Sequence, residues 1–372
     1  RSVTSSNAVE GGFAVAYSSA GVTAEATDFG NVTTGPIVFS GTAGETENIV
    51  IEILGDNIVE DNETFNVTLG VVTATTTAQI AGITTGAAGV GTINNDDTAT
   101  VTVAVSPQVT EADIDADVNF SVKLDAEVEG GFTLAFAVTP VGAGVTLAEV
   151  TDFTVITTTP LTFTGALGEV QTVTIRIVGD DIVEDNETFL IDLTTVTAPS
   201  AEQTADISTV DRTVAIQNDD IAMLTLSAPT ITETDANVVA NFVATIDAAV
   251  EGGFSVAFAS DGIGGALIST EGTDITDGAT PVAFTGNAGE TVNVPITIIG
   301  DQIVEENETF KVTLGAVTGA SISAEQISRI TTGASASAII NNDDTATVTI
   351  ADVSITETDA DQTLNFTATL DA

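Results

Sequence analysis

The sequence has no cysteine, no histidine and no tryptophan, and it has only 6 lysine and arginine residues against 54 aspartate and glutamate residues. Without cysteine there is no disulfide framework, and without cysteine and histidine there is neither a catalytic thiol or imidazole nor a zinc site of sulfur and nitrogen ligands. A formal net charge of −48 excludes nucleic acid as a partner and repels anionic membrane surfaces. No run of about 20 apolar residues occurs, so membrane insertion is not expected.

The hydrophobic content of 43% is nevertheless that of a globular protein and not of a disordered acidic tail. The apolar residues are mainly Val, Ile, Ala and Phe, interspersed with Thr, and this usage favours β-strands. At roughly 100–200 residues per domain, a chain of 372 residues is expected to hold two to four domains.

The chain repeats itself. The string VEGGF ends at Phe13, Phe132 and Phe254, and the string D-x-IVE-x-NETF begins at Asp56, recurs 124 residues later and again after 121 more. The string N-D-D closes each repeat. The repeat is therefore the size of a whole domain, which predicts a row of separate domains and not a solenoid of small repeats.

These repeats predict four units. They are 1–97, which lacks its first strands, then the complete units 98–220 and 221–344, and finally 345–372, which holds only the opening strands of a fourth. The start within a repeat indicates that the sequence was cut from a longer protein.

Within a unit, apolar residues alternate with polar ones, as at Val118, Phe120, Val122 and Leu124. A period of two between clusters of Gly, Asp and Asn predicts half-buried antiparallel strands. About seven such strands in some 120 residues predict an all-β fold of tandem immunoglobulin-like antiparallel β-sandwiches, arranged as an extended rod. The Thr-, Ala- and Ser-rich segment before each N-D-D, such as 73–91, is expected to be either a long loop or a hairpin arm.

Acidic residues recur at four separated points of every unit: an opening T-E, a central T-D, the D-x-I-x-E-x-x-E string and the closing D-D. Two carboxylates about 4 Å apart repel each other by about 1–4 kcal/mol, so a gathering at one pole of the sandwich requires cations. Oxygen ligands without His or Cys select Ca²⁺, which accepts 6–8 oxygens in irregular geometry. Lone acids such as Asp113 and Glu149 are instead interpreted as solvated surface residues. The candidate carboxylate ligands are Asp28, Asp56, Glu60, Glu63, Asp96 and Asp97; Glu111, Asp152, Asp180, Glu184, Glu187, Asp219 and Asp220; Glu233, Asp274, Asp301, Glu305, Glu308, Asp343 and Asp344; and Glu357 in the last segment.

The segment from Phe163 to Leu193, with its counterparts at 39–69 and 284–314, resembles the Calx-β domain, found in sodium/calcium exchangers, in integrin β4 and in very large bacterial adhesins. The resemblance implies that the first Asp and both Glu of each D-x-x-x-E-x-x-E string bind calcium. It also implies that the residue two after that Asp, namely Ile58, Ile182 or Ile303, contributes its backbone carbonyl. Family members often close with three acids, so Asn-Asp-Asp suggests fewer ions.

The sequence therefore predicts calcium-binding repeats, and not an enzyme, because three near-copies in series lack the ingredients of an active site. The expected function is the calcium-stiffened stalk of a giant secreted adhesin at the cell surface; the gliding-motility adhesins of Bacteroidetes are one class of such proteins, and no motif singles them out. Its expected partners are neighbouring repeats and, at a distal tip outside this sequence, a surface ligand. The alternative is that the long segment before each N-D-D binds a protein or glycan directly.

Overall fold

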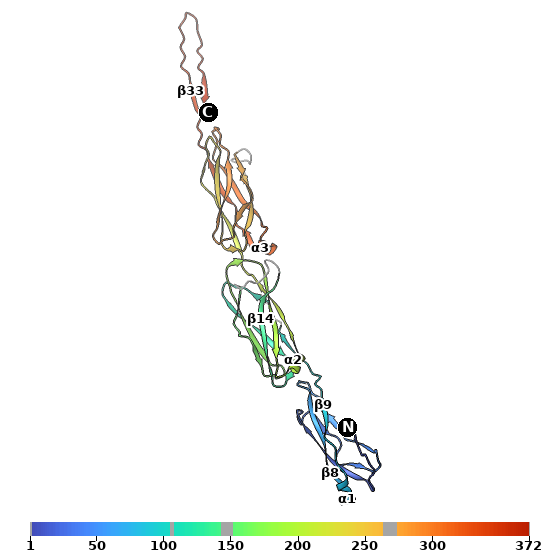
Figure 1. Ribbon diagram of the computed structural model, residues 1–372. Helices are drawn as coiled ribbons and strands as arrows, with labels where there is room; N and C mark the ends of the chain where they lie inside the picture. The colour runs from blue at the N-terminus through green and yellow to red at the C-terminus, as the bar shows by residue number, and fades with distance from the viewer. Residues whose placement is uncertain (1, 105–107, 143–151, 263–273, 372) are drawn as a thin grey trace.

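The structure is a computed structural model that describes residues 2–104, 108–142, 152–262 and 274–371. It confirms the all-β fold, since strands dominate and, within these described ranges, helices are confined to three segments of six residues each. Figure 1 shows three repeats following one another, with the terminal segment projecting as a separate hairpin beyond the third. None of the described helices is long and apolar enough to cross a membrane.

The second repeat is a sandwich of two five-stranded sheets, in the orders β15-β17-β12-β10-β20 and β11-β21-β19-β14-β16. Most pairs are antiparallel, but β20 runs parallel to β10 and β21 parallel to β11. The strands are β10 (Ala99–Val103), β11 (Val109–Thr110), β12 (Ala116–Leu124), β14 (Phe132–Pro140), β15 (Phe153–Val155), β16 (Leu161–Phe163), β17 (Val170–Ile177), β19 (Glu187–Thr197), β20 (Ile207–Val210) and β21 (Arg212–Gln217).

The third repeat has the same two sheets, in the orders β27-β29-β24-β22-β31 and β23-β32-β30-β26-β28. Its strands are β22 (Ala222–Ser227), β23 (Ile231–Thr232), β24 (Val238–Ile246), β26 (Phe254–Gly262), β27 (Ile275–Asp277), β28 (Val282–Phe284), β29 (Thr291–Ile298), β30 (Glu308–Thr318), β31 (Ile330–Thr332) and β32 (Ala336–Asn341). The terminal hairpin consists of β33 (Thr347–Ile350) and β34 (Ala368–Asp371).

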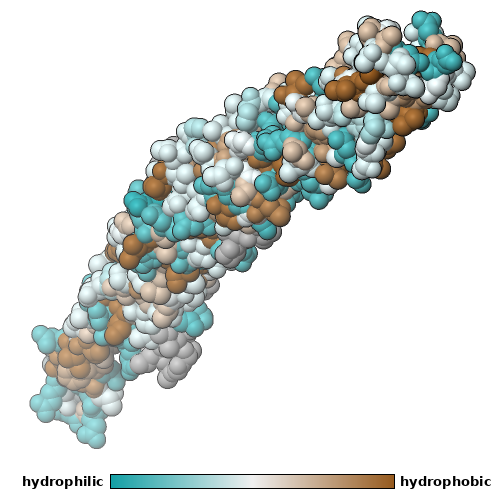
Figure 2. All heavy atoms as spheres, turned by 90° about the horizontal axis from the view of Figure 1, so that it is seen from below, coloured by the Kyte–Doolittle hydropathy of each residue, from teal (hydrophilic) through white to brown (hydrophobic). Residues whose placement is uncertain are grey.

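The predicted alternation determines the core. Phe120, Val122 and Leu124 of β12 are at most 1% exposed, and Phe120 packs edge-on against Phe189 with ring centroids 6.1 Å apart. The third repeat uses Phe242 and Phe310 in the same way. On the face drawn in Figure 2, hydrophobic residues are interspersed with hydrophilic ones along the molecule, as expected when strands turn only alternate side chains inward.

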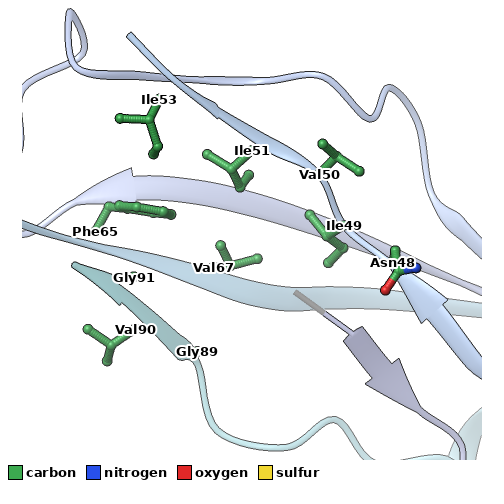
Figure 3. A pocket seen from close by; sticks show the side chains of 10 residues that line it. All are labelled: Asn48, Ile49, Val50, Ile51, Ile53, Phe65, Val67, Gly89, Val90 and Gly91. Atoms are coloured by element: carbon green, nitrogen blue, oxygen red, sulfur yellow. The ribbon is translucent and has the colours of Figure 1, made fainter. Parts of the chain in front are cut away.

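The first repeat consists of the sheet β4-β2-β8-β9 and the two-stranded sheets β1-β5 and β3-β6. Its strands are β1 (Ser2–Thr4), β2 (Phe13–Gly21), β3 (Phe29–Asn31), β4 (Ile37–Phe39), β5 (Thr46–Asn48), β6 (Ile51–Ile53), β8 (Glu63–Ala74) and β9 (Gly89–Ile93). Where β10 and β12 complete the second repeat, the first has an open cleft of ≈ 530 Å³ lined by apolar residues such as Ile51, Phe65 and Val90 (Figure 3).

The long Thr-, Ala- and Ser-rich segment is neither a plain loop nor a hairpin arm. The preceding strand extends into it, and a short helix follows: α1 (Thr77–Gly82), α2 (Ala201–Asp206) or α3 (Ala324–Arg329). Thr76, Ser200 and Ser323 cap these helices by accepting a hydrogen bond from the backbone N–H of the Gln three residues later. The cap supplies a partner for an N–H that a helix of six residues would otherwise leave unpaired.

Four short strands join consecutive repeats. β7 (Ile58–Val59) of the first repeat pairs in parallel with β13 (Glu127–Val128) of the second. In the same way, β18 (Ile182–Val183) of the second repeat pairs with β25 (Ala249–Val250) of the third. In both cases the strand of the earlier repeat belongs to its acidic string, so the acidic pole of one repeat lies against the VEGG turn of the next.

Candidate metal centre

A turn shapes each acidic string. The side chain of its first aspartate accepts a hydrogen bond from the backbone N–H of the isoleucine two residues later, at 2.9 Å for Asp56, 2.8 Å for Asp180 and 2.7 Å for Asp301. Such local bonds are the reason that aspartate favours turns. The string then leads into a long strand, β8, β19 or β30, which begins at its second glutamate. The three acids are therefore held on one bend of the backbone.

The central aspartate completes this group in all three repeats. Its carboxylate and those of both glutamates of the string offer oxygen atoms that lie within 4.8 Å of one another. The three clusters are Asp28, Glu60 and Glu63; Asp152, Glu184 and Glu187; and Asp274, Glu305 and Glu308. Residues more than thirty positions apart in the sequence thus meet because strand ends converge at one pole of the sandwich.

Burial makes these clusters costly as bare anions. Glu63 is 8% exposed and Glu187 is 4% exposed, and the Oε2 atom of each is buried without a hydrogen-bond partner among the described residues. A buried charged oxygen without a donor requires either a proton or a cation. Because the ligands are all hard oxygens and no nitrogen or sulfur ligand is available, the residues fit Ca²⁺ or Mg²⁺ and not a transition metal.

The pKa values of the cluster glutamates reflect the same unfavourable burial of negative charge. Desolvation, followed by the effect of Asp152, raises the pKa of Glu187 to about 10. Desolvation and then the charge of Glu111 raise the pKa of Glu184 to about 9. In the first repeat, desolvation is again the main cause, and it raises the pKa values of Glu60 and Glu63 to about 7. In the absence of a cation, desolvation and the neighbouring carboxylates thus favour the protonated form of these glutamates.

The opening glutamates lie beside the same clusters. Glu111 is 2% exposed and hydrogen-bonds with Glu184, and desolvation raises its pKa to about 7 despite this bond. Glu233 is 6% exposed, and burial together with the charges of Asp301 and Glu305 raises its pKa to about 7. These two residues thus occupy the predicted place.

The closing aspartate pairs lie at the edge of the pole. Desolvation and the neighbouring Asp219 raise the pKa of Asp220 to about 6. The pKa values of Asp97 and Asp344 are also raised, first by desolvation and then by the adjacent Asp96 and Asp343. The Oδ2 atoms of Asp220 and Asp344 are buried without a hydrogen-bond partner among the described residues. The pairs therefore add charge to the pole from the end of each repeat.

The remaining predicted ligands differ in their surroundings. The backbone carbonyl of Ile182 accepts a hydrogen bond from Asn218 Nδ2 at 2.9 Å, while Ile58 lies in β7 and Ile303 is 59% exposed. Glu357 is exposed in the terminal segment, away from the three clusters. Among the predicted residues, Glu357 is thus the one that the described structure does not bring to an acidic pole.

A second cluster escaped the sequence analysis. Asp113, interpreted above as a lone surface acid, offers an oxygen within 4.8 Å of oxygens of Asp181 and Asp220. These residues line a hollow of ≈ 610 Å³ that reaches across to Asp247 and Ala249 of the third repeat. The recurrence of T-E-x-D in the second and third repeats was the available signal. Glu149 lies outside the described residues.

Of the two repeats whose opening T-E-x-D segment lies in the sequence, the second alone has this carboxylate triad among the described residues. At the position of Asp181, the first repeat has Asn57 and the third has Gln302. Gln302 Nε2 donates a hydrogen bond to Asp235, the counterpart of Asp113, at 3.0 Å. In the third repeat an amide thus donates a hydrogen bond to the carboxylate whose counterpart in the second repeat faces two other carboxylates.

Among solved structures, the chain is similar to the apo-form Calx CBD1 domain, at 17% identity over 34% of this chain and 100% of that domain, with a TM-score of 0.26. It is also similar to the calcium binding domain CBD12 of CALX1.1, at 15% identity over 65% of this chain and 99% of that protein, with a TM-score of 0.25. A search of curated proteins finds no match.

The family assignment rests on the sequence itself. The family model of the Calx-beta domain matches three successive stretches of the sequence, 2–98, 94–220 and 217–354, which together span nearly the whole chain. Each stretch contains one complete acidic string and one cluster of a central aspartate with two glutamates. The protein therefore belongs to the Calx-beta domain family, as three successive repeats of that domain.

Proposed function

We propose that the protein binds calcium through its acidic poles and serves as a stiffened, extended stalk segment of a secreted cell-surface adhesin. One observation carries the proposal: each repeat brings carboxylate oxygens from separate segments of the chain within 4.8 Å of one another, and the Oε2 atoms of Glu63 and Glu187 are buried without hydrogen-bond partners among the described residues. Solved relatives include a calcium binding domain. Calcium would replace the protons that the raised pKa values otherwise require at neutral pH.

The position of the clusters supports the mechanical part of the proposal. The strings that supply their glutamates also pair with the next repeat through β7–β13 and β18–β25. Arg329 of the third repeat donates to the backbone carbonyl of Asn218, beside the closing aspartates of the second, at 2.7 Å. An ion that orders the pole of one repeat thereby orders the surface on which the next repeat rests. Linked in series, such joints would give a stalk of fixed direction.

The alternative, direct binding of a surface ligand by the long segment, is less well supported. In the second and third repeats, the helix in this segment contacts the preceding repeat, as shown by the hydrogen bonds of Asn62 with Glu202 and of Ser323 with Asp185. A segment engaged in this way offers little free surface to a glycan. We therefore assign adhesive contact to parts of the adhesin outside these repeats.

Small-angle scattering of the whole chain tests the stalk. We expect a longer maximum dimension and a narrower range of shapes in calcium than in excess chelator, at temperatures where all repeats stay folded. In the presence of calcium, the double substitution Asp219→Asn, Asp220→Asn should reproduce this loss of extension and stiffness at one joint. The substitution Asp192→Asn, on strand β19 away from the pole, is the control. Identical scattering with and without calcium would refute the stalk function.

A further inference from the structure

The two joints between repeats share a set of contacts made by residues other than the metal-cluster acids. Val59 of the first repeat is 0% exposed and belongs to the hydrophobic core of the second. Val183 of the second repeat is likewise 0% exposed and belongs to the core of the third. The backbone N–H groups of Glu129 and Glu251 donate to the carbonyls of these two valines, both at 3.0 Å. The first and the second repeat thus each insert one residue into the repeat that follows.

The capped helix holds the receiving side of the joint. Ser323, which caps α3, donates a hydrogen bond to Asp185 of the preceding repeat. Gln326 Nε2, three residues later, donates to the carbonyls of Glu251 at 3.0 Å and Val183 at 3.4 Å. The residues of one helix cap therefore donate hydrogen bonds both to the VEGG turn of their own repeat and to the acidic loop of the preceding repeat.

The first joint has the same parts. Ser200 donates to Asp61, and Gln203 Nε2 donates to the carbonyl of Glu129 at 3.1 Å. Glu202 of the same helix accepts hydrogen bonds from Asn62. The two joints use the same residue types at the same positions of the repeat, which indicates a specific recognition surface.

The alternation of the acidic string explains how one loop can serve two partners. In an extended segment, successive side chains point to opposite sides. Glu184 belongs to the metal cluster, whereas Val183 and Asp185 on either side of it face the third repeat. Asp185 is 4% exposed, and its Oδ2 atom has no hydrogen-bond partner among the described residues. A buried carboxylate so close to the cluster is tolerated better when a cation reduces the local negative charge.

We propose that the Ser/Thr-x-x-Gln helix of each repeat, with the VEGG turn beside it, is a latch whose partner is the acidic loop of another repeat of this kind. The latch recognises the valine and the acid that flank the first glutamate ligand of that loop. This inference rests on the proposed calcium-dependent stalk, because ordering of the loop by calcium would determine the strength of the latch. It gives the Thr-, Ala- and Ser-rich segment a defined role.

The structure also contains one latch and one loop that are not engaged with each other. In the first repeat, Thr76 and Gln79 form the same cap, and Gln79 Nε2 donates to the carbonyl of Glu10 at 2.7 Å. In the third repeat, Ile303 is 59% and Val304 is 49% exposed, in contrast to the complete burial of Val59 and Val183. In the first repeat the cap is therefore formed without a contact to another repeat's loop among the described residues, and in the third repeat the apolar residues of the loop are exposed.

Pulsed electron resonance between two spin labels tests the latch, and the absence of native cysteine permits labelling at chosen sites. Labels at Lys123→Cys and Asn293→Cys, both on exposed strand positions, report the distance between the second and third repeats. In calcium, the double variant Ser323→Ala, Gln326→Ala should lose the narrow distance peak of the parent chain. Asp185→Ala should do the same from the other side of the joint. Agreement of the two variants guards against misfolding of either repeat.

The matched control is Thr76→Ala, Gln79→Ala, which removes the same cap from the first repeat, outside the joint between the two labelled repeats. It should leave the peak unchanged. A narrow peak in both the Ser323/Gln326 and the Asp185 variants would overturn the latch. If the parent peak is equally narrow in calcium and in chelator while the latch variants broaden it, the latch stands and calcium stiffening fails. The two proposals are thereby separated.

Discussion

Val183 of the second repeat lies directly opposite Val250 of the third in a parallel strand pair, and it is completely buried in the third repeat's core. The joint between these repeats is therefore part of a folded core and not a flexible linker. A residue in the middle of a calcium-type acidic string thus contributes to the stability of the following domain. The predictions below follow from this arrangement and from the chemistry of the acidic poles.

Truncation of Val183 should destabilise the third repeat even though the residue belongs to the second. We expect Val183→Ala to lower the free energy of unfolding of the third repeat by about 2 kcal/mol, because buried methyl groups are lost and a cavity remains. Denaturant unfolding followed domain by domain measures the change. Val304→Ala, at the equivalent but 49% exposed position, should change stability little. Equal effects of the two substitutions would contradict the insertion of Val183 into the neighbouring core.

Removal of calcium should lower the stability of the protein sharply. An ion that binds only the folded state stabilises it by mass action, and for micromolar affinity at millimolar calcium the gain is about 4 kcal/mol per site. Thermal melting in calcium and in excess chelator measures the difference, with magnesium as the comparison ion. If the two melting curves coincide, the acidic poles are solvated surface and bind no structural cation.

In metal-free buffer the stability should fall as the pH rises. A carboxyl whose pKa is raised by folding favours the folded state only while it is protonated, so its contribution is complete below its unfolded value of 4.5 and is lost as the pH rises through its folded pKa. For Glu60 and Glu63 this window runs from 4.5 to about 7, and for Glu187 it extends to about 10. The pKa values of Glu45 and Glu169 are lowered by hydrogen bonds from Ser40 and Thr164. The stability that these two carboxylates contribute is therefore lost only as the pH falls below this window.

The substitution Glu187→Gln isolates one contribution to this pH dependence. It imitates the protonated side chain, so it should flatten part of the slope between pH 4.5 and 10 in metal-free buffer and weaken calcium binding by the second repeat. Melting temperatures across this range measure the slope. Glu127→Gln, at an exposed position of β13, is the control. If the stability of the unsubstituted chain in metal-free buffer rises with pH above 4.5, folding does not raise the pKa values of the cluster acids.

Much of this architecture was predictable because it follows from local rules repeated three times. Alternation placed Phe120, Val122 and Leu124 on one buried face, and recurrence separated the acids of the poles from the other acids of the chain. The clusters of Asp28, Asp152 and Asp274 with their two glutamates each were therefore accessible from the sequence.

Three features were not predicted, for physical reasons. The short helices have too few residues to show a helical period, and only the Ser/Thr-x-x-Gln cap at Thr76, Ser200 and Ser323 indicates them. The insertion of Val59 and Val183 depends on packing between repeats, which no single repeat encodes by itself. Asp113 resembled any exposed acid until the fold placed it beside Asp181 and Asp220.

The second acidic cluster should give the second repeat a larger capacity for calcium than the third. Asp113, Asp181 and Asp220 offer three carboxylates within 4.8 Å, whereas Gln302 donates its amide to Asp235 in the third repeat. Because the number of charged ligands tunes calcium affinity, Asp181→Asn, which introduces the residue type found at Asn57, should abolish one weaker binding event per chain. Gln302→Asp should create one, since it replaces a hydrogen-bond donor by a further carboxylate.

Native mass spectrometry at graded calcium concentrations counts the ions. The substitution Asp211→Asn, in a loop of the second repeat away from the pole, is the control for loss of charge alone. If Asp181→Asn and Asp211→Asn retain equal numbers of ions, the triad is a solvated group and the repeats have equal capacity. If Gln302→Asp gains an ion while Asp181→Asn loses one, a single position in each acidic string determines how many cations its repeat holds.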